Sequence, residues 1–242
     1  MGNALRFLCG QGFEPCTAGD SDSLGPLDIS AVTIGVSAPA QGVEFELHTL
    51  PVGARGVVDG DGINVFVSTS DPRESCLVPL EVQVAALERS VAHVWGDKAR
   101  AKELHKSIIA AGYRLIDVQN EEVLARKYRI RLRGIDAPEA GMPYGKEAKE
   151  ELAKIVQGNC LRVHVYNKDR YDRCVGDVYC DGIFVQELML KRGMAWHYKF
   201  YDQRAEFAEW EENARAERNG LWASPNPEKP WEWRRKNRRG GR

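Results

Sequence analysis

The sequence lacks the short motifs that usually hold a transition metal. Its six cysteines, at positions 9, 16, 76, 160, 174 and 180, form no Cys-x-x-Cys pair, and none of its five histidines belongs to a His-Glu-x-x-His arrangement. Zinc sites are commonly built on such spacings. We therefore expect no zinc site, and we interpret Cys160, Cys174 and Cys180 as ordinary strand residues.

Long apolar runs and a strong net charge are also missing. No stretch is apolar over the length of a membrane-spanning helix, and the first residues do not form a usual secretory signal. The thiols are therefore expected to be reduced and intracellular. The formal net charge is only −1, so an anionic ligand must be attracted by local patches. A length of 242 residues suits one well-cored domain with appendages.

The N-terminal segment has the features of a lipid-anchored tether. The chain begins Met-Gly-Asn-Ala-Leu-Arg-Phe-Leu-Cys, which offers Gly2 for a myristoyl group and Cys9 for a palmitoyl group. Two acyl chains give stable attachment where one is marginal. Arg6 replaces the Ser or Thr of the usual motif, so an ordinary disordered start is the alternative. Residues 1–42 are predicted to tether the protein flexibly to the cytoplasmic face of the cell membrane, and a soluble cytoplasmic protein is the alternative.

Residues 128–139 combine a strand pattern with an acidic turn. Apolar residues alternate with three arginines, which predicts a strand that buries one face and presents guanidinium groups on the other. Asp136 and Glu139 follow directly. This set suits phosphate chemistry, because a guanidinium binds phosphate oxygens, one carboxylate can hold a hard cation and the other can take a proton from water. An arginine-rich surface strand with an ordinary acidic turn is the alternative.

The remaining patterns predict further strands and helices. Alternation predicts a strand from residue 43 and a hairpin over 57–67. The turn of this hairpin, Asp59-Gly60-Asp61-Gly62, has glycines where a hairpin needs positive φ. The alternative is that Asp and Gly are present only because they favour turns. Helical spacing predicts two helices within 83–111, broken near Gly96. The later patterns predict a helix over 144–156, strands from 161 and 173 with a turn at Asp181-Gly182, and helices over 184–191 and 205–218.

This order predicts an α+β fold that is mainly β, built as a five-stranded OB-fold barrel with packed helices. The domain is expected over residues 43–223, with a helical insertion between barrel strands at about 70–125. Residues 224–242 are predicted to be a basic tail. From residue 229 onward the tail holds seven Lys or Arg residues against one Glu. Such a run is usually solvated and mobile, although it can bind phosphates or anionic lipid.

Five motifs closely resemble, in order, those of the staphylococcal nuclease (thermonuclease) family. Between residues 52 and 222 they are Val-Val-Asp-Gly-Asp61, Arg-Leu-Arg-Gly-Ile-Asp136-Ala-Pro-Glu139, Tyr144-Gly-Lys-Glu-Ala, Asp169-Arg-Tyr-Asp-Arg173 and Arg192-Gly-Met-Ala. Each motif is weak alone, but five in register are highly specific. The insertion and both ends of the chain look like the plant calcium-dependent nucleases of this family, whose N-termini are acylated.

The resemblance implies a Ca²⁺ site. Asp61 and Asp136 would hold the ion through their carboxylates, together with the backbone carbonyl of Ala137, and such hard oxygen ligands suit calcium. Gly62 and Ala137 stand where the bacterial enzyme has threonines. Because the latter position supplies its carbonyl, we expect this difference to do little harm.

The resemblance also implies the catalytic residues. Glu139 would be the general base that deprotonates the attacking water, Arg131 and Arg173 would bind the scissile phosphate, and Tyr171 would help to position the substrate. The family splits the P–O5′ bond of DNA and RNA with little sequence preference, leaving a 3′-phosphate and a 5′-hydroxyl. We expect single-stranded or locally opened substrates, and a monomer without a protein partner.

Two departures and one rival interpretation remain. The loop between Glu139 and Tyr144 is shorter than its bacterial counterpart, and the insertion joins the strand of Asp61 to the strand of Arg131, where it could alter access or serve regulation. The rival is a non-catalytic OB-fold scaffold that binds nucleic acid or protein. Scaffolds of this family usually lose one or more of the charged site residues, whereas this chain keeps all five.

Overall fold

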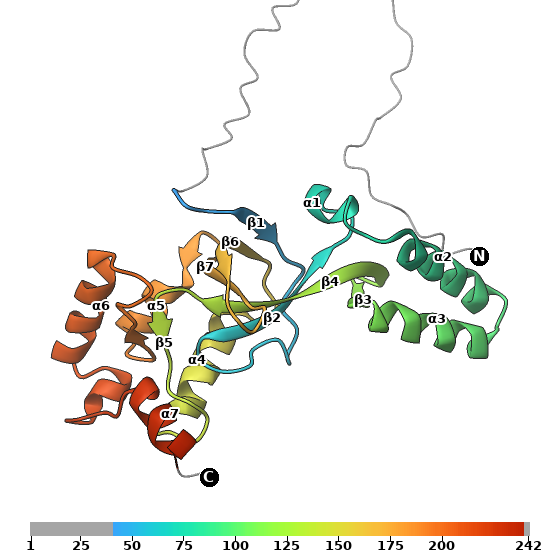
Figure 1. The fold of residues 1–242 in the computed structure, drawn as a ribbon. Helices are drawn as coiled ribbons and strands as arrows, with labels where there is room; N and C mark the ends of the chain where they lie inside the picture. Colours follow the sequence, from blue (N-terminus) through green and yellow to red (C-terminus); the bar gives the residue numbers. More distant parts are fainter. Residues whose placement is uncertain (1–40, 240–242) are drawn as a thin grey trace, which may run out of the picture.

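The computed structural model describes residues 41–239, so Gly2 and Cys9 lie outside the described residues. Within that range the chain forms a mixed sheet flanked by helices (Figure 1). None of the described helices is long and apolar enough to cross a membrane. In chain order the elements are β1 (Phe45–His48), β2 (Gly62–Ser68), α1 (Pro72–Ser75), α2 (Leu80–Val94), α3 (Lys98–Ala110), β3 (Tyr113–Val118), β4 (Glu121–Leu132), β5 (Ile135–Asp136), α4 (Gly145–Val156), β6 (Leu161–Lys168), β7 (Cys174–Cys180), β8 (Ile183–Phe184), α5 (Val185–Lys191), β9 (Trp196–His197), α6 (Ala205–Ala216), the 3₁₀ helix η1 (Gly220–Ala223) and α7 (Pro230–Arg239).

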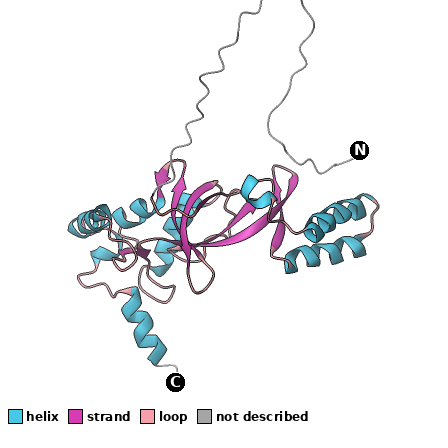
Figure 2. Ribbon diagram, turned by 45° about the horizontal axis from the view of Figure 1, so that its top comes forward, coloured by secondary structure: helices cyan, strands magenta, loops and turns pink. Residues whose placement is uncertain are grey.

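Five strands form the main path of the sheet, in the order β1-β6-β7-β4-β2. Figure 2 shows the strands in the middle of the molecule, with helices on both sides of them. Neighbouring strands on this path are antiparallel except for β4 and β7, which run parallel. In β4, Tyr128, Ile130 and Leu132 are buried, whereas the residues between them reach the surface. The predicted alternation is therefore confirmed, and Arg129 and Arg131 lie on the face of β4 turned away from the core, while Arg133 follows the end of the strand.

The path of five strands with packed helices agrees with the predicted α+β fold of the OB type. Its two ends, β1 and β2, form no ladder with each other in the described part of the chain. Just beyond β1, the N–H of Leu50 donates a hydrogen bond of 2.7 Å to the C=O of Phe66 in β2. Closure of the sheet into a barrel therefore stays a prediction.

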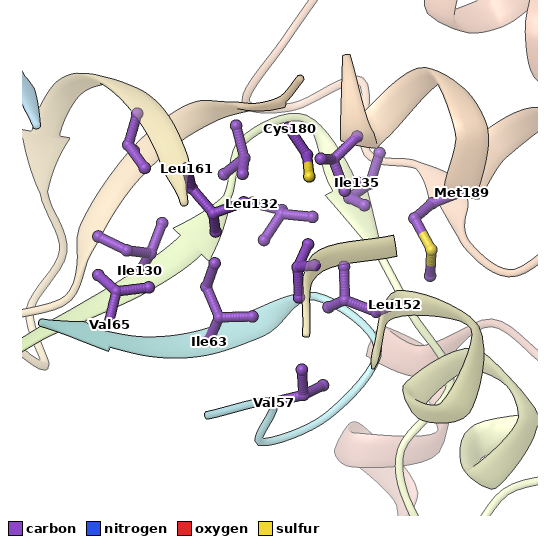
Figure 3. Close-up of a cluster of buried hydrophobic side chains, with 14 of the residues drawn as sticks. Val57, Ile63, Val65, Ile130, Leu132, Ile135, Leu152, Leu161, Cys180 and Met189 are labelled. Atoms are coloured by element: carbon purple, nitrogen blue, oxygen red, sulfur yellow. The ribbon is translucent and has the colours of Figure 1, made fainter. Parts of the chain in front are cut away.

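The main core lies between the sheet and helices α4, α5 and α6. Ala148, Leu152 and Val156 recur every four residues and form the buried face of α4. Figure 3 shows Leu152 and Met189 pointing toward side chains of the sheet. The helices thus cover the inner face of the sheet, while on the other face of β4 Arg129 is exposed and the Arg131 side chain is 15% exposed.

The helical insertion has a small core of its own. Helices α2 and α3 pack against each other and against β3, burying Val82, Leu104 and Ile108. The predicted break is confirmed, because the chain turns at Gly96 with φ +74° and Asp97 caps α3. The insertion lies at the start of β4, at the opposite end of that strand from β5 (Figure 1). It is therefore remote from the β4–β5 corner.

The predicted basic tail contains a helix. Residues Pro230–Arg239 form α7, where the sequence predicts a solvated and mobile run. Trp231 stacks on Tyr198 with ring centroids 5.1 Å apart, and its centroid lies 6.0 Å from that of Trp196. Aromatic side chains bury large areas. The tryptophans within the run therefore dock it onto the domain despite its charge.

An ion-pair cluster fixes the corner between β4 and β5. The N–H of Tyr198 donates to the C=O of Gly134 at 2.8 Å, beside the pairing of β5 with β9. Asp202 packs directly against Gly134, because a Cβ added at Gly134 would lie only 2.8 Å from the Cβ of Asp202. Nη2 of Arg204 lies 2.6 Å from Oδ2 of Asp202, and its Nη1 lies 2.8 Å from Oδ2 of Asp177. The two aspartate side chains are only 1% exposed. Arg204 thus ties the segment after β9 to β7 and to the corner.

Arg204→Met should destabilise the fold, because it leaves two buried carboxylates without their main partner; such a loss typically costs about 3–5 kcal/mol. Burial alone would raise the pKa of Asp202, but the hydrogen bonds and charge of Arg204 hold it below its usual value. Stability from this pair is therefore present above the unfolded pKa of roughly 4 and is lost as pH falls through the lower folded pKa.

Urea unfolding of wild type and Arg204→Met at pH 7 and pH 3 tests this. The difference in the free energy of unfolding should be smaller at pH 3 than at pH 7. Lys102→Met, on the exposed face of α3, is the control and should change it by less than about 0.5 kcal/mol. Equal differences at both pH values for the Arg204 variant would contradict the assignment.

Candidate active site

The corner between β4 and β5 brings an arginine and an aspartate together. Arg131 extends from the outer face of β4, and Gly134, with φ +76°, turns the chain into β5. Asp136 ends β5 and is completely buried. Its Oδ1 accepts a hydrogen bond of 2.6 Å from Nη2 of Arg131. As the sequence predicts, local geometry holds this pair.

The turn before β2 contributes a second carboxylate. Gly62 lies opposite Arg131 in the β2–β4 ladder, so Asp61 comes beside Arg131 although 70 residues separate them. Nη1 of Arg131 lies 2.5 Å from Oδ2 of Asp61, and the N–H of Ala137 donates to the same oxygen at 2.7 Å. One guanidinium group therefore bridges Asp61 and Asp136.

Burial and mutual repulsion control the charges of this cluster. Burial raises the pKa of Asp136, the charge of Asp61 raises it further, and the neighbouring arginines only partly oppose this. Asp59 accepts a hydrogen bond from the N–H of Asp61, and burial, followed by the charge of Asp61, raises its pKa to about 6. Crowded carboxylates favour a nearby positive charge. Arginine supplies it here, and a bound cation would satisfy the same requirement.

Glu139 lies at the start of the loop that leads into α4. Its C=O accepts a hydrogen bond of 2.8 Å from the N–H of Met142, and a Cβ at Gly145 would come within 2.0 Å of the same carbonyl oxygen. Only glycine fits there, so the loop is tight. The side chain of Glu139 is 34% exposed and therefore reaches water.

Arg234 is the site residue that the sequence reasoning missed. From α7, its Nη1 donates to Oε1 of Glu139 at 2.7 Å and its Nη2 donates to Oδ2 of Asp136 at 2.6 Å. A basic run near a chain end is usually solvated, so its sequence indicates only a general capacity to bind phosphates or anionic lipid and no contact with the carboxylates. Trp231 and Trp233 were the available signal, since tryptophans in a charged run indicate a packed segment.

Arg173 and Tyr171 lie apart from the carboxylates. Cys174 pairs with Ile130 in the parallel ladder, so strand alternation puts Arg173 on the same face of the sheet as Arg131. The guanidinium of Arg173, however, binds Oδ2 of Asp169 at 2.7 Å, and Tyr171 is 51% exposed. Among the described contacts, neither residue touches Asp61, Asp136 or Glu139. Their predicted roles stay predictions.

The oxygen donors fit a hard divalent cation in their chemistry. Asp61, Asp136 and Glu139 supply carboxylates, the ligands that Ca²⁺ prefers. In residues 41–239, however, no group of three or more His, Cys, Asp or Glu side chains is arranged to hold a metal ion. The guanidinium groups of Arg131 and Arg234 contact the carboxylate oxygens instead. A cation would therefore have to displace these contacts.

The turn that carries Asp61 differs from the prediction. Positive φ is predicted at Gly60 and Gly62, but neither residue adopts it, and the predicted hairpin reduces to a single bridge ahead of β2. The glycine at position 60 is required for space. A Cβ there would come within 2.6 Å of the Cβ of Ala137 and 2.8 Å of the Cβ of Ala148. This close approach sets Asp61 against the end of β5 and against α4.

Most of the chain is similar to known nucleases. The family described as "Staphylococcal nuclease homologue" matches residues 129–224. Staphylococcal-like nuclease CAN1 of Arabidopsis thaliana is 61% identical over 206 residues, which cover 85% of this chain and 63% of that protein. Probable staphylococcal-like nuclease CAN1 of Oryza sativa subsp. japonica is 62% identical over 201 residues, covering 83% of this chain and 61% of that protein.

A bacterial protein matches half of the chain. Micrococcal nuclease of Shigella flexneri is 36% identical over 135 residues, which cover 50% of this chain and 78% of that protein. By contrast, the chain spans only about three fifths of the length of the plant relatives. The family match over residues 129–224 includes Arg131, Asp136 and Glu139.

Gly60→Ala should destabilise the fold, because the added methyl group overlaps Ala137 and Ala148; overpacking of this kind typically costs about 1–3 kcal/mol. Urea unfolding measures the cost. Gly53→Ala is the matched control, since nothing lies within 4 Å of a Cβ at that position. The same change in both variants would contradict the steric explanation.

Proposed function

Because this chain belongs to the staphylococcal nuclease family, we propose that it is a Ca²⁺-dependent nuclease that hydrolyses phosphodiester bonds of DNA and RNA. It acts as a monomer on single-stranded or locally opened substrates. The observation that carries the proposal is the bridging of Asp61 and Asp136 by Arg131, with Glu139 alongside. The cluster contains the proposed cation ligands, a proposed phosphate-binding arginine and the proposed general base.

Asp61, Asp136 and the backbone carbonyl of Ala137 are the proposed ligands of Ca²⁺. The crowding of two buried carboxylates supports this assignment, because they require positive charge nearby. When bound, the ion supplies electrostatic stabilisation for the charge that develops on the phosphate. Arg131, which contacts both carboxylates, would have to leave them in order to bind the substrate.

Glu139 is the proposed general base, and its partial exposure supports this role. Its carboxylate takes a proton from water, whose oxygen forms a bond to phosphorus. The P–O5′ bond breaks, O5′ gains a proton from solvent and Glu139 releases its proton to solvent, so that the products are a 3′-phosphate and a 5′-hydroxyl. Arg131 and Arg173 hold the non-bridging oxygens and oppose the charge that builds up in the transition state, while Tyr171 positions the substrate.

Little base sequence is read under this proposal. The charged residues of the site suit the phosphodiester, and contacts to phosphate carry no direct sequence information. An exposed aromatic side chain such as Tyr171 can stack on any base. The site thus suits both DNA and RNA.

A non-catalytic OB-fold scaffold is the second candidate. It would bind nucleic acid or protein through the same sheet without cutting. The intact set of Asp61, Arg131, Asp136, Glu139 and Arg173 favours the enzyme, because a scaffold needs no base beside two buried carboxylates.

Glu139→Gln should lower the rate of single-stranded DNA cleavage by about 10²–10⁴-fold, because glutamine keeps the shape of the side chain but cannot take a proton. Cleavage of a labelled oligonucleotide is measured with Ca²⁺ and with a calcium-selective chelator, which should stop the wild type. Glu147→Gln, exposed on α4, is the control and should cut at the wild-type rate. Binding without cutting by the wild type would favour the scaffold.

We also propose that the protein is anchored to the cytoplasmic face of the cell membrane by acyl groups on Gly2 and Cys9. The start of the sequence supports this, because it provides both acceptors within nine residues. One acyl chain gives only reversible binding, and the second makes attachment stable.

Gly2→Ala should move the protein from the membrane fraction to the soluble fraction, because alanine at this position cannot be myristoylated. Cell fractionation measures the distribution, and Asn3→Ala is the matched control. Cys9→Ser should weaken attachment without abolishing it. Unchanged partitioning of the Gly2 variant would refute the anchor.

A further inference from the structure

The site contains one arginine, Arg234, to which the proposed function assigns no role. It extends from α7, near the end of the described chain, and its two terminal nitrogens lie 2.6 Å from Oδ2 of Asp136 and 2.7 Å from Oε1 of Glu139. Burial alone would lower the pKa of Arg234, but hydrogen bonds and charge from both carboxylates raise it above its usual value. A charged guanidinium group therefore contacts both the proposed base and a proposed metal ligand.

Helix α7 is held in place by contacts that do not involve Arg234. Trp231 stacks on Tyr198, and the ammonium group of Lys229 lies 5.9 and 5.7 Å from the ring centroids of Trp196 and Trp231. Two residues after Trp231, Trp233 lies close to the loop after Glu139, since a Cβ added at Gly141 would come within 3.4 Å of the Trp233 ring. The packed helix presents Arg234 to the site as a fixed element.

Arg234 repeats the arrangement of Arg131. Arg131 binds Oδ1 of Asp136 and a carboxylate oxygen of Asp61, whereas Arg234 binds Oδ2 of Asp136 and a carboxylate oxygen of Glu139. The planar fork that fits a carboxylate also fits two oxygens of a phosphate. We propose that Arg234 is a further phosphate-binding arginine of this active site, which contacts the scissile phosphate from the side opposite Arg131. This inference rests on the proposed function.

The charges of the site favour this role. Asp61, Asp136 and Glu139 meet here, and Arg131 is the only arginine of the sheet that contacts them within the described residues. An anionic phosphodiester approaching these carboxylates is repelled. The second guanidinium group, from α7, reduces that repulsion at the point where the substrate must bind.

The alternative is that Arg234 blocks the site and must leave before substrate binds. Departure of α7 would expose the packed Trp231 ring and break its stacking on Tyr198. A change of rotamer at Arg234 alone, with the helix in place, releases both carboxylates and keeps the guanidinium group within the site. The second movement disrupts less structure and leads to a substrate contact.

Binding measurements test the phosphate contact directly. In a Glu139→Gln background, which prevents cutting, binding of a single-stranded oligonucleotide with Ca²⁺ present is followed by fluorescence anisotropy at several salt concentrations. Loss of one phosphate contact should reduce the slope of log K against log salt by about 0.7. We expect this reduction when Arg234→Ala is added. Adding Arg235→Ala should leave the slope unchanged, because Arg235 is the exposed neighbouring residue and makes no described ion pair. Equal slopes for the two double variants would overturn the inference.

Cleavage by the single variants provides the second readout. Arg234→Ala should lower kcat/KM by about 10²-fold, Arg234→Lys should recover part of it, and Arg235→Ala should match wild type. A higher rate of cleavage by Arg234→Ala than by wild type would overturn the inference, because it would mean that Arg234 on α7 inhibits the enzyme. If Arg234→Ala unfolds at a lower temperature by circular dichroism, Arg234→Lys replaces it in the cleavage assay. Lysine keeps the charge but not the planar fork, so a kcat/KM of Arg234→Lys equal to that of wild type would then overturn the inference. A wild type that does not cut would refute the proposed function, whereas equal cutting by wild type and Arg234→Ala would refute only the role of Arg234.

Discussion

The guanidinium group of Arg131, held between the carboxylates of Asp61 and Asp136, is the interaction on which the site depends. Two buried carboxylates this close repel each other and require positive charge. Arg131 can supply that charge because β4 pairs with β2, which places the turn containing Asp61 beside Arg131. On its other edge, β4 pairs with β7. The central strand therefore determines where the charged groups meet.

Close packing around the corner keeps these groups in register. Gly60 brings the Asp61 turn against Ala137, and Gly145 brings the first turn of α4 against the carbonyl group of Glu139. Arg204 ties two buried carboxylates on β7 and after β9 to the same region. These contacts are buried and tight, so the site is rigid where the proposed chemistry needs fixed distances.

The two appended parts of the chain relate differently to the site. The helical insertion has its own small core and lies at the far end of β4, remote from Asp136. The C-terminal helix, in contrast, docks through Trp231 and delivers Arg234 to Asp136 and Glu139. A direct contribution to the proposed chemistry is therefore expected from α7 and not from the insertion.

The sequence by itself determined several of the elements and the local part of the site. Period-two alternation predicted the second half of β4, the spacing of apolar residues predicted the helices of the insertion, and Arg131, Asp136 and Glu139 lie within nine residues, so local geometry brings them together. Only the tertiary structure decided that Asp61 shares the guanidinium group of Arg131, that Gly60 is needed for space and not for positive φ, and that Arg234 enters the site. Each of these facts depends on the pairing or docking of segments far apart in the chain, and the sequence pattern of one segment carries no information about the distance to another.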